Sequence, residues 1–471
     1  MNDMNRATRM KTGLSALALA LLIAGCASVP PISESALPAT PAAFKEGDGR
    51  WAVAAPAAAQ GAGSWWKGFG DPLLDDLVER AGRENTSVQV AAARVAQARA
   101  LLRSTDANRA PQVGLSAGAV RQTVLPGAGP QAATLVSAGV GLSYEVDVFG
   151  RLSRESDAAT LDLQSRTALL QAARLIAQAD VAQSYFTLRA LDIERDILRD
   201  TLDAYRGTLR LVERRFQAGD VAELDVARVR TELAATESEA FALDARRAAL
   251  EHAIAVLVGE AASRFAIDAS PWQASLPLVP AGVPSTVLAR RPDVAAALAQ
   301  LKASQARVGV AQTAWFPSVT LTAAGGFASP ELGDVFKWSA RTWAAGALLA
   351  LPLLDGGRRQ AGVDAARAEF DAGLAGYRER VLVAFKEVED ELAALRLLAD
   401  QAQAQTRAID SARRATVLSE SRYRNGLVSQ LDLLDAQRSE LRSRRQAVQV
   451  QAAQYQSTVG LIRALGGGWD S

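Results

Sequence analysis

Apolar and polar residues alternate in four stretches of the chain. In VSAGVGLSYEVDV (136–148) the even positions carry Val, Ala, Leu or Tyr, and the odd positions carry Ser, Gly, Glu or Asp. The stretch after Pro111 alternates in the same way, and the turn-forming LPGAGPQ (125–131) separates the two. A period of two predicts strands with one apolar and one polar face, joined here as a β-hairpin.

The second half of the chain repeats this hairpin. Val319, Leu321 and Ala323 alternate with other residues, SPELGD (329–334) supplies the turn, and a return strand ends near Pro352. Strands of ten or more residues are long for a soluble sheet and suit a tilted crossing of a lipid bilayer.

A proline-free segment of 68 residues follows each hairpin, one between Gly150 and Gly219 and one between Gly357 and Gly426. Spacings of three and four between apolar residues predict coiled-coil helices, each about 100 Å long at 1.5 Å per residue. Plain bundle helices are the alternative, which leaves the amphipathic hairpins unexplained. The seam positions are Leu188, Leu191, Arg195, Leu198, Leu202, Tyr205, Leu209, Val212 and Phe216, then Val381, Phe385, Val388, Leu392, Leu395, Ala399 and Ala402.

The chain contains the same unit twice. RRFQAGDVAELDV (214–226) aligns with SRYRNGLVSQLDL (421–433) at an offset of 207 residues, and residues 88–117 align with 294–323 at an offset of 206. Such self-similarity predicts an internal two-fold repeat of helix, β-hairpin, long helix and return helix. The copies span 64–258 and 290–465, with a proline-rich connection at 259–289 and a C-terminal tail at 466–471.

The N-terminus has the pattern of a secretory signal. Residues 1–25 place basic residues before an apolar run, and IAGC at its end resembles the bacterial lipobox. Cys26 would then carry a lipid such as palmitate, followed by a tether at 26–63, and Ala27 favours the outer membrane. The alternative is an ordinary signal before a chance free thiol. Cys26 is the only cysteine, which excludes an intrachain disulfide, and we expect no cofactor beyond this lipid.

Charge and composition narrow the function. The chain carries a net charge of +1, and removal of residues 1–25 leaves 49 basic and 50 acidic groups. A near-neutral chain gives no reason to expect a nucleic-acid partner. The single histidine, His252, lies in an apolar helical segment, and no metal-spaced cluster or phosphate-binding loop is present in the sequence. The sequence therefore does not predict an enzyme.

Four strands cannot enclose a pore in lipid, because open sheet edges there leave backbone groups unpaired. The smallest membrane barrels have about eight strands, so several chains must combine their hairpins. Three copies would supply twelve strands, although the periodicity itself leaves the number open. A lipid-anchored coiled-coil scaffold is the alternative, but it gives the hairpins no role.

Four segments and the duplicated turns together resemble the TolC-like outer-membrane efflux proteins, in particular the lipoprotein branch (NodT and OprM type) of resistance-nodulation-division efflux systems. The resemblance covers residues 64–465. The segments are SWWKGFGDPLLDDLV (64–78), YEVDVFGRL (144–152), LARRPDVAAAL (288–298) and TAWFPSVTL (313–321), with the turns at 214–226 and 421–433.

This resemblance implies a mixed α and β membrane protein. Its expected form is a homotrimer with a twelve-stranded β-barrel, four strands per chain, a long periplasmic α-helical barrel and an equatorial domain. Such a channel would export drugs or other small solutes with a periplasmic adaptor protein and an inner-membrane transporter. The duct of a type I protein secretion system is the alternative function.

The duplicated turns are the expected periplasmic tips, where this family meets the adaptor. Gly at each turn suits a helix end because it tolerates positive φ. By matching position, the resemblance assigns adaptor contact to both turns; simple helix capping is the alternative. The residues are Arg215, Gly219, Leu224 and Asp225, with Arg422, Gly426 and Leu431 in the second copy.

The second turn is also the expected gate. Asp432 and Asp435 are three residues apart and share a helix face, whereas the first copy has Asp225 followed by Arg228. The resemblance places these aspartates in an acidic ring at the periplasmic constriction, with Tyr423 tethering the closed tip. The alternative is a helix N-terminus that favours acidic residues through its dipole.

Overall fold

The computed structural model describes residues 37–47, 63–124, 131–270, 272, 274–277, 279, 287–288 and 290–467. The signal, Cys26 and most of the predicted tether lie outside these residues. The described chain forms two compact units. We call Arg94–Arg166 with Ala296–Arg378 the sheet unit, and Pro38–Ala93, Thr167–Ala295 and Glu379–Ser471 the helical unit.

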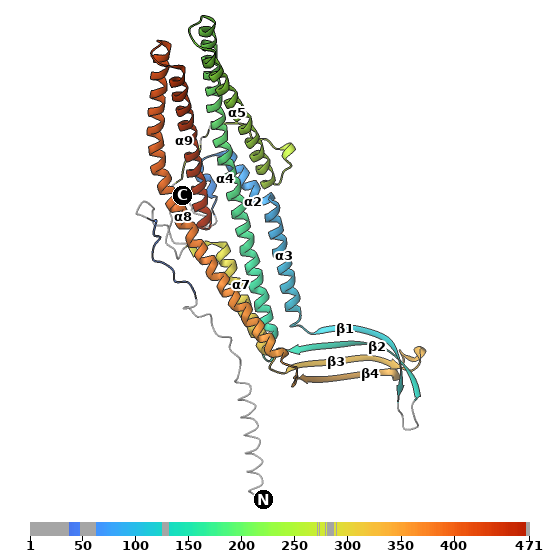
Figure 1. Cartoon of the computed structure of the whole chain (residues 1–471). Helices are drawn as coiled ribbons and strands as arrows, with labels where there is room; N and C mark the ends of the chain where they lie inside the picture. The colour runs from blue at the N-terminus through green and yellow to red at the C-terminus, as the bar shows by residue number, and fades with distance from the viewer. Residues whose placement is uncertain are drawn as a thin grey trace. The chain divides into compact units, whose positions relative to one another are not determined.

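The sheet unit contains one antiparallel sheet in the order β1-β2-β3-β4 (Figure 1). Its strands are β1 (Gln112–Val124), β2 (Gln131–Val146), β3 (Ser318–Ser329) and β4 (Arg341–Ala350). The two predicted hairpins are therefore confirmed, and β2 pairs with β3 to join them.

The strand register confirms the predicted alternation. Leu115 lies opposite Val140, Leu142 opposite Ala323, and Leu321 opposite Ala347, so apolar residues of all four strands share one face. The other face carries Gly, Ser or Thr at half of its positions. Leu115 and Trp343 on the apolar face are 82% and 85% exposed in the single chain. The apolar face of this sheet is therefore not covered by the described part of the chain.

Where β2 meets β3, two glycines let the backbones approach closely. Gly139 lies opposite Gly326, and a Cβ on Gly139 would be 2.9 Å from the carbonyl oxygen of Gly325. Any larger residue at this point would force the hairpins apart.

The helices include two of 67 residues, α4 (Arg151–Gln217) and α8 (Arg358–Arg424). They confirm the long uninterrupted helices predicted from the proline-free segments. Each is followed by a 35-residue antiparallel helix, α5 (Glu223–Leu257) or α9 (Gln430–Ala464) (Figure 1). The shorter helices are α2 (Pro72–Glu84), α3 (Thr86–Ala107) and α7 (Pro292–Thr313), with single 3-10 turns at Trp65–Phe69, Ala262–Arg264, Leu332–Asp334 and Trp338–Ala340.

Among the described residues, no helix combines the length and the apolar character needed to span a lipid bilayer.

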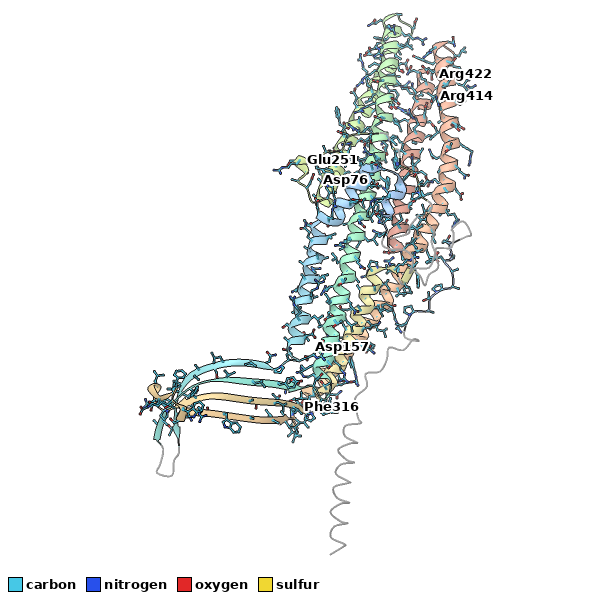
Figure 2. The ribbon with its side chains drawn as sticks, turned by 180° about the vertical axis from the view of Figure 1, so that it is seen from behind. Asp76, Asp157, Glu251, Phe316, Arg414 and Arg422 are labelled. Atoms are coloured by element: carbon cyan, nitrogen blue, oxygen red, sulfur yellow. The ribbon has the colours of Figure 1, made fainter. Side chains whose placement is uncertain are left out.

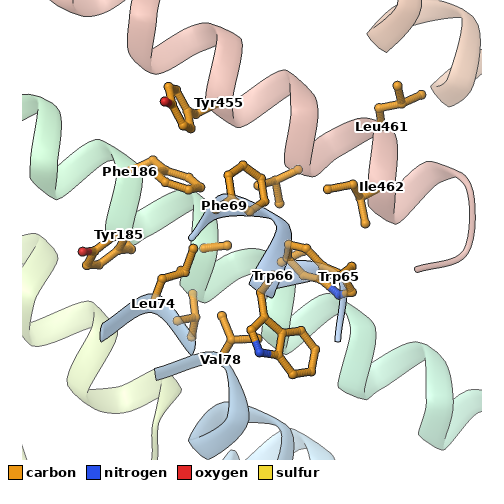
Figure 3. Close-up of a cluster of buried hydrophobic side chains, with 14 of the residues drawn as sticks. Trp65, Trp66, Phe69, Leu74, Val78, Tyr185, Phe186, Tyr455, Leu461 and Ile462 are labelled. Carbon is orange, nitrogen blue, oxygen red and sulfur yellow. The ribbon is translucent and has the colours of Figure 1, made fainter. Parts of the chain in front are cut away.

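An aromatic core fixes the helical unit (Figure 3). Trp65, Trp66 and Phe69 of the WWKGF motif are buried in it. The ring of Phe186 on α4 lies 4.9 Å from that of Phe69 and 4.7 Å from that of Tyr455 on α9. The motif therefore joins one helix of each copy.

The second arginine of the RRPD segment (290–293) connects three parts of the same unit. Arg291 is buried and binds Asp293 at 2.8 Å and Glu387 at 2.7 Å. It also donates to the carbonyl of Ala464 at the end of α9, at 3.0 Å. A buried cation with three acceptors explains why this segment requires arginine at this position.

Candidate functional site

The two predicted tips have the same backbone geometry. Gly219 and Gly426 have φ values of 82° and 70°, a conformation that side-chain-bearing residues rarely adopt. At the first tip Gly219 donates to the carbonyl of Phe216 at 3.0 Å and Asp220 to that of Arg215 at 2.8 Å. Gly426 and Leu427 repeat these bonds to Tyr423 and Arg422. Both long helices therefore end in a Schellman motif, as expected for glycine at this position.

The helices that leave the tips begin differently. In the second copy, Ser429 and Asp432 form a capping box: the Ser429 backbone N–H donates to the Asp432 carboxylate at 2.9 Å, and the Asp432 N–H donates to the Ser429 hydroxyl at 3.3 Å. The Ser429 hydroxyl also donates to the Asp432 carboxylate at 2.7 Å, and the hydrogen bonds donated by the hydroxyl and the backbone N–H of Ser429 lower the pKa of Asp432. Ala222 occupies the equivalent position of the first copy and provides no side-chain cap. Within one chain, Asp432 thus caps the N-terminus of α9, the helix end whose dipole was the alternative explanation for the acidic residues.

The second gate aspartate has a different environment. Asp435 is exposed and accepts a hydrogen bond from Arg438 at 3.2 Å. Arg438 also binds Glu232 on α5 through both carboxylate oxygens. The cluster of Asp435, Arg438 and Glu232 therefore keeps one excess negative charge beside the start of α9. Sequence reasoning missed this contact because Arg438 and Glu232 are 206 residues apart.

Tyr423 lies in the tip core rather than on its surface. It is 4% exposed and belongs to a cluster with Val212, Val226 and Leu433. Burial raises the pKa of Tyr423. Its hydroxyl has no hydrogen-bond partner of normal geometry among the described residues. The equivalent residue of the first copy, Phe216, is exposed instead.

Arg215 joins the two tips. Its guanidinium carbon lies 4.9 Å from the centre of the Tyr423 ring, and its Nη2 donates to the carbonyl of Arg424 at 3.3 Å. A cation over an aromatic face at this distance is attracted to the ring. Arg215, predicted only as an adaptor contact, is thus half-buried against the second tip, whereas Arg422 is exposed near the end of α8 (Figure 2).

The other predicted contact residues lie on the outside of the turns. Leu224 and Leu431 are exposed apolar residues at the start of α5 and α9. Asp225 is partly exposed and lies 3.6 Å from Arg228. Two further exposed apolar residues, Phe216 and Leu427, adjoin these positions.

A cavity of about 510 Å³ lies between α4, α8 and α9 next to the tips. The buried hydroxyls of Tyr205 and Tyr423 and the Oε1 of Gln437 border it without hydrogen-bond partners among the described residues. Buried polar groups of this kind normally bind water or another partner. No group of three acidic, histidine or cysteine side chains in the described parts of the chain is arranged to hold a metal ion.

Comparison with known proteins places this geometry in a family. The model of the outer membrane efflux protein family matches residues 77–260 and again 283–467. The chain belongs to this family. The two matches fall on the two copies of the repeat.

Related proteins and solved structures align with nearly the full length of this chain. The pyoverdine export outer membrane protein OpmQ of Pseudomonas aeruginosa is 34% identical over 97% of both chains. The solvent efflux pump outer membrane protein SrpC of Pseudomonas putida is 32% identical over 95% of this chain and 97% of its own. The outer-membrane channel OprN has a TM-score of 0.86 at 30% identity, covering 94% of this chain and 100% of that one.

These similarities confirm the predicted relationship to outer-membrane efflux channels, and with it the mixed helical and sheet content and the outer-membrane location. The chain is an outer-membrane exit duct.

Proposed function

We propose that three copies of this chain form a twelve-stranded β-barrel that continues into the periplasm as a helical barrel, with an equatorial belt that includes residues 259–289. The observation that carries this proposal is the sheet itself. Among the described residues it has one exposed apolar face and two edge strands, β1 and β4, that each pair on one side only. In lipid, closure with further copies is what satisfies such edges.

A comparison of α3 with α7 supports the same assembly. These helices occupy equivalent places in the repeat, yet Ala296 and Val308 of α7 are buried, whereas their counterparts Val90 and Leu102 of α3 are exposed and half-buried. On α7, Arg307 lies 2.5 Å from Asp162 and 3.7 Å from Glu369. Asp162 and Glu369 are 207 residues apart and thus equivalent, so α7 lies between the two long helices of its own chain.

The helix α3 leaves more of its surface exposed among the described residues. It contacts α4 through Asp106, which accepts a hydrogen bond from Ser156 at 2.5 Å. By the repeat, its uncovered side would pack on α8 of the adjacent copy, as α7 packs on α4. The assembly therefore supplies both the missing strand partners and the missing helix partner.

At the periplasmic end we assign gating to the second tip. Three copies would bring together the carboxylates of Asp432 and Asp435, and a ring of carboxylates attracts cations. Tyr423 and its contact with Arg215 would hold the tip in its closed arrangement. The capping box and the Arg438 pair place both carboxylates at the start of α9, where α9 follows the turn.

The partners follow from the family. Relatives are named for pyoverdine export and for solvent and toluene efflux. We therefore assign this duct to a tripartite pump for drugs or other small solutes, in preference to a type I secretion duct. A periplasmic adaptor would contact the tips through Arg422, Leu224, Leu431 and their neighbours, and an inner-membrane transporter would drive export.

Two measurements on the full-length protein test the assembly. Light scattering in detergent should give about three times the monomer mass, and planar bilayers should show ion conductance. A stable monomer without conductance would overturn the proposal.

A matched pair of variants tests which face of the sheet meets lipid. Ala117 and Ser116 are neighbours on β1 and point to opposite faces. Ala117→Arg should reduce insertion into the outer membrane, because an arginine facing lipid costs about 2 to 4 kcal/mol near the midplane. Ser116→Arg should insert normally and alter conductance. The reverse result would invert the assignment of the faces.

Export and anchoring need separate assays. In cells that lack their own efflux ducts, the chain together with its adaptor and transporter should restore resistance to small toxic compounds. Mass spectrometry should find a lipid on Cys26, and Cys26→Ser should abolish it. Secretion of a protein substrate without any change in resistance would favour the type I alternative.

A further inference from the structure

The two β-hairpins of the chain are built with the same register. Gln112 lies opposite Ser143 in the first hairpin, and Ser318 opposite Ala350 in the second. A shift of 206 residues on the first strand and 207 on the second converts one pair into the other, as in the sequence repeat. The same shift carries the pair Val113 and Leu142 onto Val319 and Leu349.

The chain also shows how one hairpin pairs with the next. Strand β2 lies beside β3, with Val146 opposite Val319 and Val140 opposite Gly325. A closed ring of equivalent hairpins repeats this contact at every junction, including those between chains. The junction within the chain is therefore a template for the junction between chains.

We propose that β4 of one copy pairs with β1 of the next copy in the register that this template dictates. The inference rests on the proposed assembly and adds the register between strands of neighbouring copies. Adding 207 to a residue number of β2 gives its equivalent in β4, and subtracting 206 from a residue number of β3 gives its equivalent in β1. It places Leu353 opposite the partner's Val113, Leu351 opposite the partner's Leu115, Ala347 opposite the partner's Ala119, and Trp343 opposite the partner's Thr123.

The end of β4 supports this register. Strand β2 extends to Val146, which corresponds to residue 353, but β4 stops at Ala350. Among the described residues no strand pairs with residues 351–353, and Leu353 and its neighbour Leu354 are 81% and 97% exposed. In the proposed register residues 351–353, where Pro352 has no N–H to donate, lie opposite residues 113–115 of the partner subunit, so β4 ends at the position equivalent to the end of β2.

The side chains on the two strands also support this register. Leu353, Leu351 and Ala347 meet the partner's Val113, Leu115 and Ala119, all on the face that is apolar in the rest of the sheet. A slip of one residue would turn one strand's apolar residues to the other face. The partner's Val120 lies opposite Gly346, which has no side chain to crowd it.

Disulfide trapping tests the register directly. Ala119 and Ala347 are both small and exposed, and they lie on the two outer strands of one sheet, three strand spacings apart. Neighbouring strands are about 4.8 Å apart, so this pair is too distant to bridge within a chain. Between chains the proposed register brings their Cα atoms to about 4.5 to 5.5 Å, within disulfide range.

The double variant Ala119→Cys with Ala347→Cys should therefore form covalent multimers on mild oxidation in outer membranes. The matched control, Ala117→Cys with Ala347→Cys, is two residues out of register and should crosslink at least tenfold less. Each single variant should stay monomeric on non-reducing gels. Two differently tagged single variants, Ala119→Cys and Ala347→Cys, should give a mixed dimer when expressed together.

The outcomes separate the register from the assembly. Efficient crosslinking of the control pair with a weak response of the predicted pair would overturn the register and leave the assembly intact. If neither pair crosslinks although light scattering finds multimers, β4 and β1 do not meet in this way and the inference fails. If every variant is monomeric by both methods, the inference and the proposed function fail together.

Discussion

The guanidinium carbon of Arg215 lies 4.9 Å from the centre of the Tyr423 ring and ties the first tip of the chain to the second. The contact links equivalent turns of the repeat, yet it is not itself repeated. The equivalent of Arg215 is Arg422, which is exposed, and the equivalent of Tyr423 is Phe216, also exposed. The two tips are therefore alike in backbone and different in side-chain environment.

Loss of this contact should loosen the second tip. Arg215→Ala removes the cation over the ring and the hydrogen bond to Arg424, and cation–π contacts contribute about 0.5 to 2 kcal/mol. If the closed state depends on it, the open population rises by roughly twofold to thirtyfold, since 1.4 kcal/mol corresponds to tenfold. Single-channel recordings should show higher conductance or longer openings. Arg199→Ala, an exposed arginine on the same helix, serves as the control and should behave like the parent protein.

Substitutions at the N-caps of α5 and α9 should change the stability of the two helix starts in opposite directions. Ser429→Ala removes a hydroxyl that caps α9, whereas Ala222→Ser would allow Asp225 to complete a capping box on α5. Changes between serine and alanine at this position amount to about 0.5 to 2 kcal/mol of helix stability. Amide exchange in the first turn should become faster in α9 of Ser429→Ala and slower in α5 of Ala222→Ser. Equal exchange rates before and after both changes would argue against a stabilising cap.

The stabilisation of the α9 start by this cap should also depend on pH and be lost at low pH. The pKa of Asp432 is lowered by hydrogen bonds from Ser429, so the folded tip favours the charged carboxylate. For a lowered folded pKa, the stabilisation is present above the unfolded value and is lost as pH falls through the folded value. Exchange protection of the α9 start should thus hold from neutral pH to about 4, near the ordinary pKa of aspartate, and decline below it. Ser429→Ala should weaken this dependence, and loss of protection near pH 6 would contradict the assignment.

Charge at the gate should control ion preference. Asp432→Asn with Asp435→Asn keeps the size of both side chains and removes two negative charges per chain. If the carboxylates line the constriction, cation preference in planar bilayers falls and the conductance changes at low salt, where screening is weakest. Asp225→Asn in the first copy is the matched control and should change selectivity less. A double variant with unchanged selectivity would leave Asp432 with its capping role alone.

Local patterns in the sequence predicted much of this fold. The alternation after Pro111 and the glycine at each tip depend on neighbouring residues, and both are present in the structure as expected. The long helices could also be predicted from the sequence, because the absence of proline and the spacing of apolar residues can be seen within each segment. Periodicity and backbone conformation are properties of short segments, which explains this success.

The side-chain contacts of the tips could not be predicted from the sequence in this way. Tyr423 and Phe216 align in the repeat, and nothing in the aligned letters indicates that one is buried and the other exposed. The partner of Arg438 is far away in sequence, and its choice depends on how α9 lies against α5. Asp432 was predicted as a gate residue or as an acid favoured by the helix dipole, and its capping box with Ser429, three residues earlier, was not predicted.

The ion pair between Arg438 on α9 and Glu232 on α5 offers a test of how the two copies hold together at the tip. Both carboxylate oxygens of Glu232 accept from Arg438, and the glutamate is 18% exposed while the arginine is 42% exposed. Such partly exposed pairs contribute about 1 kcal/mol or less after solvent screening. Reversal of one charge, by Arg438→Glu or by Glu232→Arg, places like charges together and should raise amide exchange in both helices. The double reversal restores opposite charges and should recover most of the protection, although Asp435 then faces a glutamate at position 438. Single reversals without effect, or a double reversal no better than the worse single one, would mean that the apolar cluster around Tyr423 holds the tips without help from this pair.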